Sequence, residues 1–391
     1  MSAAQASTVQ AQGRLVDVRT VSTGAVLESW SFADPRAGSG SSAVRSARQL
    51  TIPIVVVVPV VAGLSLDAYA AYAKGTVSVG GGSGGAGEEY ELSGVSDVKL
   101  RLSGHLGRDN VLLTLGASLP SGATTLGTRQ LQALSVLAAP ALRFRTPTLG
   151  SGTSATTGLV VAGQAGSWAL AAGGAFEFRG EYSPAQAISA GIASPTLRPG
   201  HAVHVSLGAD QIVANARQSV GLVADIYTSG QLRDLEAGDT DQRFQLGPSL
   251  AGTYQLQLPT GSGESTLYLL GRYRSNYKLG GRTVIDSWRL ESEIGTVTLV
   301  PLTPQASFRI GLDGRMHASP GLARDEERSL SSFATSGIVA GGVTVGLQYG
   351  LSGGSLLLEP YVRAQRGQLD LGGVTRTATG TSLGLTLTSR F

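Results

Sequence analysis

The sequence predicts an all-β fold: a transmembrane, antiparallel, up-and-down β-barrel of about sixteen strands, with fourteen or eighteen strands as alternatives. Three observations predict it. Apolar and polar residues alternate with a period of two, short and long connections alternate, and the composition is unsuited to a soluble core. The alternation is clearest at the end of the chain, where Leu383, Leu385 and Leu387 are separated by single small or polar residues. This spacing places all three leucines on one face of a strand.

The composition favours a barrel wall over a globular interior. The 391 residues include 55 glycines, and only 15% of the chain is charged and 6% aromatic. Glycine supplies no side chain to a core and costs backbone entropy on folding, whereas a barrel strand can meet lipid on one face and water on the other. The net charge is +3 and the cations occur singly, so we expect no nucleic acid partner. The absence of cysteine suits a bacterial envelope compartment.

The start of the chain carries a weak export pattern. Residues 4–6 read "AQA", which resembles the small-x-small pattern of a signal cleavage site. We expect residues 1–13 to be a flexible segment, either the remnant of an export signal or an ordinary flexible start, and residues 14–391 to form the barrel. The longest apolar run, Ile52–Leu64, is too short for a spanning helix and contains two prolines.

Connections of two kinds alternate from about Gln49 onward. The expected short turns cover residues 61–65, 107–110, 165–168, 259–264, 301–305 and 352–355. The expected long loops cover residues 80–89, 121–155, 183–200, 229–242 and 318–332. Short periplasmic turns on one rim and long extracellular loops on the other are typical of outer-membrane barrels.

Charged residues alternate with apolar ones inside the expected strands, which keeps charge off the lipid face. In the segment 308–317, Arg309 and Asp313 share one face while Phe308 and Ile310 share the other. By this parity the residues expected to line the lumen are Lys99, Arg101, His105, Glu177, Arg179, Glu181, Arg272, Arg274, Arg289, Glu291, Glu293, Arg309, Asp313, Arg315, Glu359 and Arg363. Two interpretations remain open: a paired network that braces a partly filled lumen, and a cation-lined constriction that favours anions.

One hairpin permits a prediction of register. A turn near Gly281 and Arg282 would place three pairs opposite one another: Arg274 with Glu291, Arg272 with Glu293, and Tyr277 with Trp288. The two charged pairs would then face the lumen. The aromatic pair would belong to the girdle at the outer rim.

The long loop at residues 121–155 contains "LQALSVLAAPALRF", which is too apolar for a solvated loop, and Pro140 divides it into pieces too short to span a membrane. We expect this loop to fold inward and narrow the lumen. The apolar residues expected to form this constriction are Leu131, Leu134, Leu137, Leu142 and Phe144. A loop packed on the outer rim, or an extra short hairpin, is the alternative.

Two short motifs carry a family resemblance. They are "GVSDV" at residues 94–98 and "LPSG" at residues 119–122, separated by a strand, a short turn and a second strand. In these residues the chain resembles the outer-membrane family named for the meta-pathway of phenol degradation, which is similar to the fatty-acid and hydrocarbon channels of Gram-negative bacteria. The resemblance implies an outer-membrane channel for small, often hydrophobic or aromatic, molecules, and it supplies no catalytic residues.

Three hypotheses of function follow. The first is a monomeric channel for passive passage of small hydrophobic or aromatic molecules, the second a general pore for polar solutes, and the third a structural or docking barrel that binds an envelope protein. The expected partners are membrane lipid, lipopolysaccharide, a small solute and, through the terminal Phe391, the barrel-assembly machinery. We expect no cofactor, no metal site and no catalytic residues. A glycine-rich match to a dinucleotide fingerprint at residues 80–85 is not followed by a helical pattern.

Overall fold

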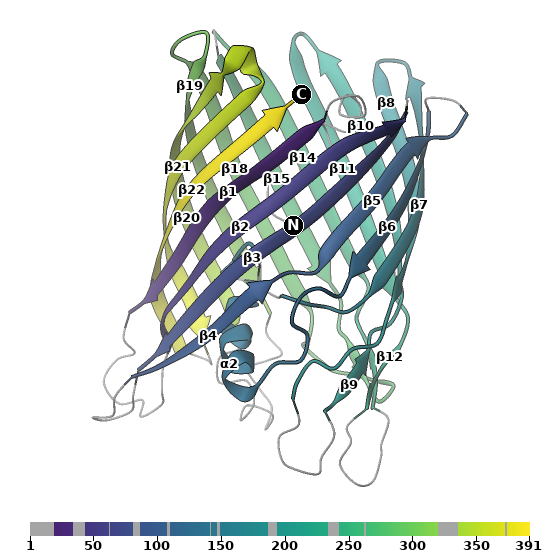
Figure 1. Cartoon of the computed structure of the whole chain (residues 1–391), viewed down its shortest axis with the longest axis vertical. Coiled ribbons are helices and arrows are strands. Elements are labelled where there is room, and N and C mark those ends of the chain that lie inside the picture. Colours follow the sequence, from purple (N-terminus) through teal and green to yellow (C-terminus); the bar gives the residue numbers. More distant parts are fainter. Residues whose placement is uncertain are drawn as a thin grey trace.

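The computed structural model describes residues 19–33, 44–61, 63–80, 87–107, 110–140, 142–146, 149–186, 194–233, 242–261, 263–319, 335–371 and 374–391. The expected flexible segment at residues 1–13 lies outside these ranges. Strands account for most of the described chain, as Figure 1 shows. No helix among the described residues combines the length and the apolar character needed to cross a membrane.

The wall is one closed antiparallel ladder. Its strands are β1 (Thr20–Phe32), β2 (Val44–Val61), β3 (Leu64–Val79), β4 (Glu88–Val95), β5 (Val98–His105), β6 (Val111–Leu119), β7 (Ser154–Ala165), β8 (Trp168–Arg179), β10 (Ala202–Val213), β11 (Ala216–Tyr227), β14 (Ser249–Thr260), β15 (Gly263–Arg274), β18 (Arg289–Pro301), β19 (Ala306–Ala318), β20 (Thr335–Leu351), β21 (Leu356–Leu371) and β22 (Val374–Arg390).

Sixteen positions around the ring are filled, because β4 and β5 both pair with β3 and act as one interrupted strand. Strand β22 pairs with β1 and closes the ring. The prediction of an all-β barrel of about sixteen strands is therefore confirmed.

The outward side chains form an apolar band. On β10, Val203, Val205 and Leu207 are 40%, 44% and 54% exposed, while the polar His204 and Ser206 between them turn the other way. An apolar surface of this extent would promote association in water. In a lipid bilayer the same side chains contact hydrocarbon, so no apolar surface is exposed to water. A closed ladder also satisfies backbone hydrogen bonds without water. The chain is therefore an outer-membrane β-barrel, located in the bacterial outer membrane.

Short turns gather at one rim and long connections at the other, as Figure 1 shows. The six predicted short turns all join neighbouring strands, and a seventh joins β10 to β11. In that turn Ala214 and Asn215 have φ angles of 46° and 71°, the positive values that a two-residue hairpin turn requires. This seventh turn is not among the turns expected from the sequence, because neither of its two central residues is glycine. Thr20 pairs with Arg390 at this rim, so both described ends of the wall lie there.

A second, smaller sheet lies at the long-loop rim. Its strands, in order across the sheet, are β17 (Arg282–Thr283), β16 (Lys278–Leu279), β13 (Gln242–Gln245), β12 (Gly230–Arg233) and β9 (Thr196–Arg198). These strands come from three different connections between wall strands. They join those connections by backbone pairing at that rim.

The register predicted for the hairpin at residues 277–286 is wrong. Arg272 pairs with Glu291 and Arg274 pairs with Arg289, a shift of two residues from the prediction. The tight turn is centred on Gly280 and Gly281, and the residues after Thr283 leave the ladder before β18 begins. Trp288 meets Tyr273, with ring centroids 6.4 Å apart, and Tyr277 meets Phe244, with ring centroids 5.6 Å apart.

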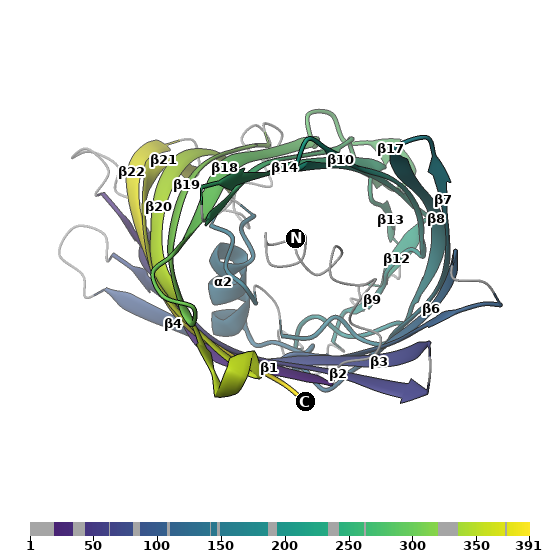
Figure 2. The same ribbon diagram turned by 90° about the horizontal axis from the view of Figure 1, so that it is seen from above.

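The hydrophobic core lies inside one side of the ring. The connection between β6 and β7 contains the helix α2 (Thr128–Leu137), which contacts β2, β3 and β4. Figure 2 shows this helix within the ring of strands. Val136 and Leu137 are buried there in one cluster with Trp30 and Val77 of the wall. A side chain at Gly75 would collide with Leu137, because its Cβ would lie 2.3 Å from the leucine Cδ1. The absence of a side chain at Gly75 therefore lets the helix approach the wall.

Candidate functional site

The interruption between β4 and β5 anchors the base of the β6–β7 loop. Asp97, 3% exposed, accepts hydrogen bonds on Oδ1 from the Gly122 amide (3.0 Å) and on Oδ2 from the Ser151 amide (2.7 Å) and hydroxyl (3.2 Å). The Ser121 hydroxyl donates to the carbonyl of Ser96 at 3.1 Å. These contacts join the two motifs "GVSDV" and "LPSG", so the residues that carried the family resemblance serve here to fix both ends of the loop.

Further contacts hold the middle of the loop against the wall. The Trp30 Nε1 donates to the carbonyl of Leu142 at 3.2 Å. The Gln49 side chain donates to the Thr146 carbonyl at 2.7 Å and accepts from the Thr146 amide at 3.0 Å. The side-chain amide thus makes the two hydrogen bonds that a paired backbone residue makes in an antiparallel sheet. Arg143 forms an ion pair with Glu293 on the wall. Burial lowers the pKa of Arg143 below its ordinary value, and the neighbouring Glu291 opposes that shift.

The apolar loop residues are turned toward the wall. Leu137, Leu142 and Phe144 are 0%, 2% and 5% exposed, and Leu131 and Leu134 pack against the same cluster. The sequence expectation for this loop included no helix, whereas the structure has α2 there, which ends just before Pro140. Because these five side chains are engaged with the wall, they act as anchors of the loop.

The register identifies which side chains share the inner face. Gln49 on β2 and Glu293 on β18 face the loop, because they contact it. Directly paired residues lie on the same face of a sheet, so the assignment passes from strand to strand around the ring. It places Glu291, Arg272 and Arg274 on the inner face. The same reasoning adds, through the pairs of β14, β11 and β10, Ser249, Asp225 and His204.

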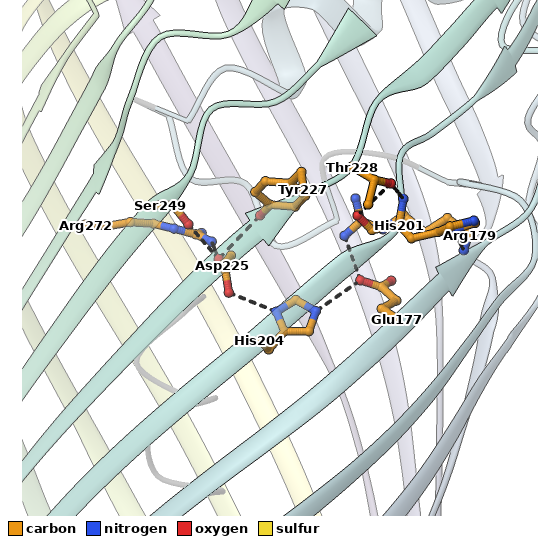
Figure 3. Close-up of polar contacts among 9 residues, drawn as sticks. All are labelled: Glu177, Arg179, His201, His204, Asp225, Tyr227, Thr228, Ser249 and Arg272. Atoms are coloured by element: carbon orange, nitrogen blue, oxygen red, sulfur yellow. Dashed lines mark hydrogen bonds and ion pairs between the residues drawn. The ribbon is translucent and has the colours of Figure 1, made fainter.

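A polar network occupies this inner face between β8 and β15, as Figure 3 shows. His204 lies between two carboxylates, with its Nδ1 2.9 Å from Asp225 and its Nε2 3.4 Å from Glu177. Asp225, 6% exposed, also accepts from the Ser249 hydroxyl (2.6 Å) and from Arg272 (3.1 Å).

Arg179 joins the same network. It binds Glu177 at 2.6 Å and lies over the ring of Tyr227, 5.4 Å from its centroid. Each carboxylate in the network therefore has a cationic partner.

This network lacks the geometry of a hydrolase. In a nucleophilic relay the serine hydroxyl contacts the histidine and the acid contacts the opposite ring nitrogen. Here Ser249 donates to Asp225, and both nitrogens of His204 face carboxylates. No metal-binding group of three or more His, Cys, Asp or Glu residues occurs in the described part of the chain. These side-chain contacts cross-link five neighbouring wall strands, β8, β10, β11, β14 and β15, and brace this part of the wall.

Other predicted lumen residues lie in pairs or alone. Arg101 pairs with Asp67, Arg363 pairs with Asp313, and Glu359 accepts from Gln348 at 3.3 Å. His317 lies 3.8 Å from Glu291.

The remaining predicted lumen residues differ in position. Arg315 lies over the ring of Trp30, 5.1 Å from its centroid. His105 is exposed at the short-turn rim, and Glu181 is exposed beyond the end of β8. Neither Lys99 nor Arg309 forms an ion pair with another residue of the described ranges. Whether these side chains touch a solute stays a prediction.

Several anchoring residues were not among those predicted from the sequence. Asp97, Gln49 and Glu28 are examples; the last accepts from the Arg145 amide at 3.0 Å. Glu28 lies between the buried Val26 and Trp30 on one face of β1, and a lone charge between apolar neighbours is the signal that could have identified it. The partners of Gln49 and Glu28 lie about a hundred residues away, which no local pattern specifies.

Comparisons with known proteins give no family. No family model matches the chain, and no curated protein matches it. OprB of Pseudomonas putida superimposes with a TM-score of 0.49 at 9% identity, over 96% of this chain and 94% of that one. OccK11 of Pseudomonas aeruginosa gives 0.42 at 12%, and the COG4313 outer membrane channel of Pseudomonas putida F1 gives 0.38 at 11%, each over 96% of both chains. At such identities and scores we draw no functional conclusion from them, and the resemblance to the meta-pathway family stays a hypothesis.

Proposed function

We propose that this chain is a channel through which small polar solutes cross the outer membrane passively. One observation supports this reading above the others: the apolar side chains of the inward loop are packed against the wall, and the inner face left over is rich in charged and hydrogen-bonding groups. Such a surface is readily wetted. It offers favourable contacts to hydrated solutes and few to hydrocarbon-like ones.

The hypothesis of a hydrophobic or aromatic solute has less support from this geometry. It relied on the apolar loop as a lining for the path, but Leu137 and Leu142 present almost no surface to a passing molecule. Burying a charged wall against an apolar solute would also carry a desolvation cost. No observation on the described residues favours the third hypothesis, a docking barrel.

The first test measures the conductance of the purified protein in planar lipid bilayers bathed in potassium chloride solution. The second test measures the swelling of proteoliposomes in solutions of small neutral sugars. We expect stepwise current and sugar-dependent swelling. Absence of both would contradict the proposal.

A matched pair of variants excludes a contaminating porin. Ser206 and Val205 are neighbours on β10 that face opposite sides of the wall. Ser206→Trp places a large ring on the inner face and should reduce the step size, whereas Val205→Trp places the same ring toward lipid and should leave it unchanged. An unchanged step size in both variants would assign the current to another protein.

A further inference from the structure

Two arginines lie directly opposite one another on the inner face at the long-loop end of the wall. Arg274 is the last residue of β15 and Arg289 the first of β18, and the ladder pairs them in register. Opposed residues of an antiparallel pair have Cα atoms only about 5 Å apart. Both side chains are half-buried. Like charges in this arrangement repel one another, so the pair is unfavourable unless something neutralises it.

No acid of the described ranges forms an ion pair with either arginine. Within the described ranges no carboxylate oxygen lies within ion-pair distance of either guanidinium, and the Arg274 Nε is buried without a hydrogen-bond partner. The nearby acids are engaged elsewhere: Asp225 with Arg272 and His204, and Glu293 with Arg143.

Glu291 is the remaining acid on this part of the face. It lies two residues from Arg289, opposite Arg272, and is 3.8 Å from His317. Two positive charges and one negative charge therefore share this part of the face, and one positive charge is left over.

From this arrangement we infer that Arg274 and Arg289 form a binding site for the oxyanion group of a passing solute, a carboxylate or a phosphate, and that they make the channel favour anions. The inference rests on the proposed function. A guanidinium offers a planar fork of N–H donors that matches two oxygens of such a group. An anion between the two arginines would replace their mutual repulsion with two attractive contacts. At the entrance of a low-dielectric passage the same charges also raise the local concentration of anions.

The first test measures the reversal potential across a bilayer with a potassium chloride gradient. Wild-type channels should favour chloride over potassium. The double variant Arg274→Gln/Arg289→Gln should lower that permeability ratio by roughly threefold, the factor that corresponds to a change in potential of about kT. The single variant Arg289→Gln should fall between the two. Because the substitutions remove a repulsive pair, we expect both variants to fold, which a gel-mobility shift on heating verifies.

A matched control removes the same charge from the opposite face. Arg48 on β2 and Arg366 on β21 are exposed and alternate with the inward Gln49 and Gln365. Arg48→Gln/Arg366→Gln should leave the permeability ratio unchanged. An equal loss of selectivity in this control, or no loss in the Arg274/Arg289 variant, would overturn the inference.

The second test identifies the oxyanion. Inorganic phosphate or benzoate is added to the chloride solution, and the drop in chloride current is compared between wild type and the Arg274/Arg289 variant. A larger drop in wild type with phosphate alone supports a phosphate site, and with benzoate alone a carboxylate site. An equal drop in chloride current in the two proteins would contradict a binding site at Arg274 and Arg289. A wild-type channel that conducts without anion preference overturns the inference alone, whereas a wild-type protein that carries no current overturns the proposed function.

Discussion

Replacing Leu207 with arginine is expected to lower the free energy of unfolding by about 2–4 kcal/mol, the cost of an arginine near the bilayer midplane on the lipid face of a barrel. Leu207 lies near the middle of β10, is 54% exposed in the bare chain, and pairs with the outward Leu222 of β11. The measurement is reversible unfolding in denaturant from lipid vesicles.

The control for this substitution is one residue away. Ser206 faces the lumen, where an arginine head can stay hydrated, so Ser206→Arg should change the unfolding free energy by less than about 1 kcal/mol. Equal costs at the two positions would mean that the two faces of β10 meet the same solvent. That result would be incompatible with a membrane-spanning wall.

Removing the carboxylate of Asp97 should release the inward loop. Asp97→Ala deletes three hydrogen bonds to both ends of the loop, and bonds to a charged acceptor contribute about 1.5–3 kcal/mol each. If the free energy that favours the closed loop falls by only about 3 kcal/mol, the population of molecules with an open loop rises roughly a hundredfold. Trypsin cleavage at Arg143 in detergent should accelerate by a similar factor, since proteolysis follows the open population when reclosing is fast. Channel current should become larger and noisier.

The conservative variant Asp97→Asn separates the charge from the shape. The amide oxygen can still accept one of the three hydrogen bonds in the Oδ1 position or two in the Oδ2 position, while the amide nitrogen faces donors. We expect cleavage and current between those of wild type and Asp97→Ala. Unchanged proteolysis in Asp97→Ala would show that Gln49 and Trp30 suffice to hold the loop, and that the interruption of β4 and β5 has another cause.

The fold followed from the sequence because its determinants are local. A period of two fixes which side of a strand each residue faces, and turn residues mark where strands end. The same locality explains the error at residues 277–286. The hairpin of β16 and β17 is short and pairs Lys278 with Thr283, and the residues after Thr283 leave the ladder. The wall pair Arg274–Arg289 therefore cannot be found by counting back from the turn. Helix α2 was missed for a similar reason: its apolar residues pack against β3 and β4, and the sequence of the loop alone does not show that these strands lie beside it.

The candidate site could be predicted from the sequence only in part. Parity placed Glu177, Arg272 and Glu291 on a common face, but it could not show that Asp225 would contact both His204 and Arg272. Which side chains meet depends on the register of every strand pair from β8 to β14. An error in any one of these registers changes the partners. The opposed arginines were hidden for the same reason, since the predicted register gave Arg274 an acidic partner.

The most direct test of the central claim uses the absence of cysteine from the chain. Single cysteines placed along β10 at His204, Val205, Ser206, Leu207 and Gly208 are reacted in proteoliposomes with a maleimide that does not enter lipid. We expect the inward positions 204, 206 and 208 to react and the outward positions 205 and 207 to stay unmodified. Equal reaction at all five positions would contradict a wall with hydrocarbon on one side and water on the other.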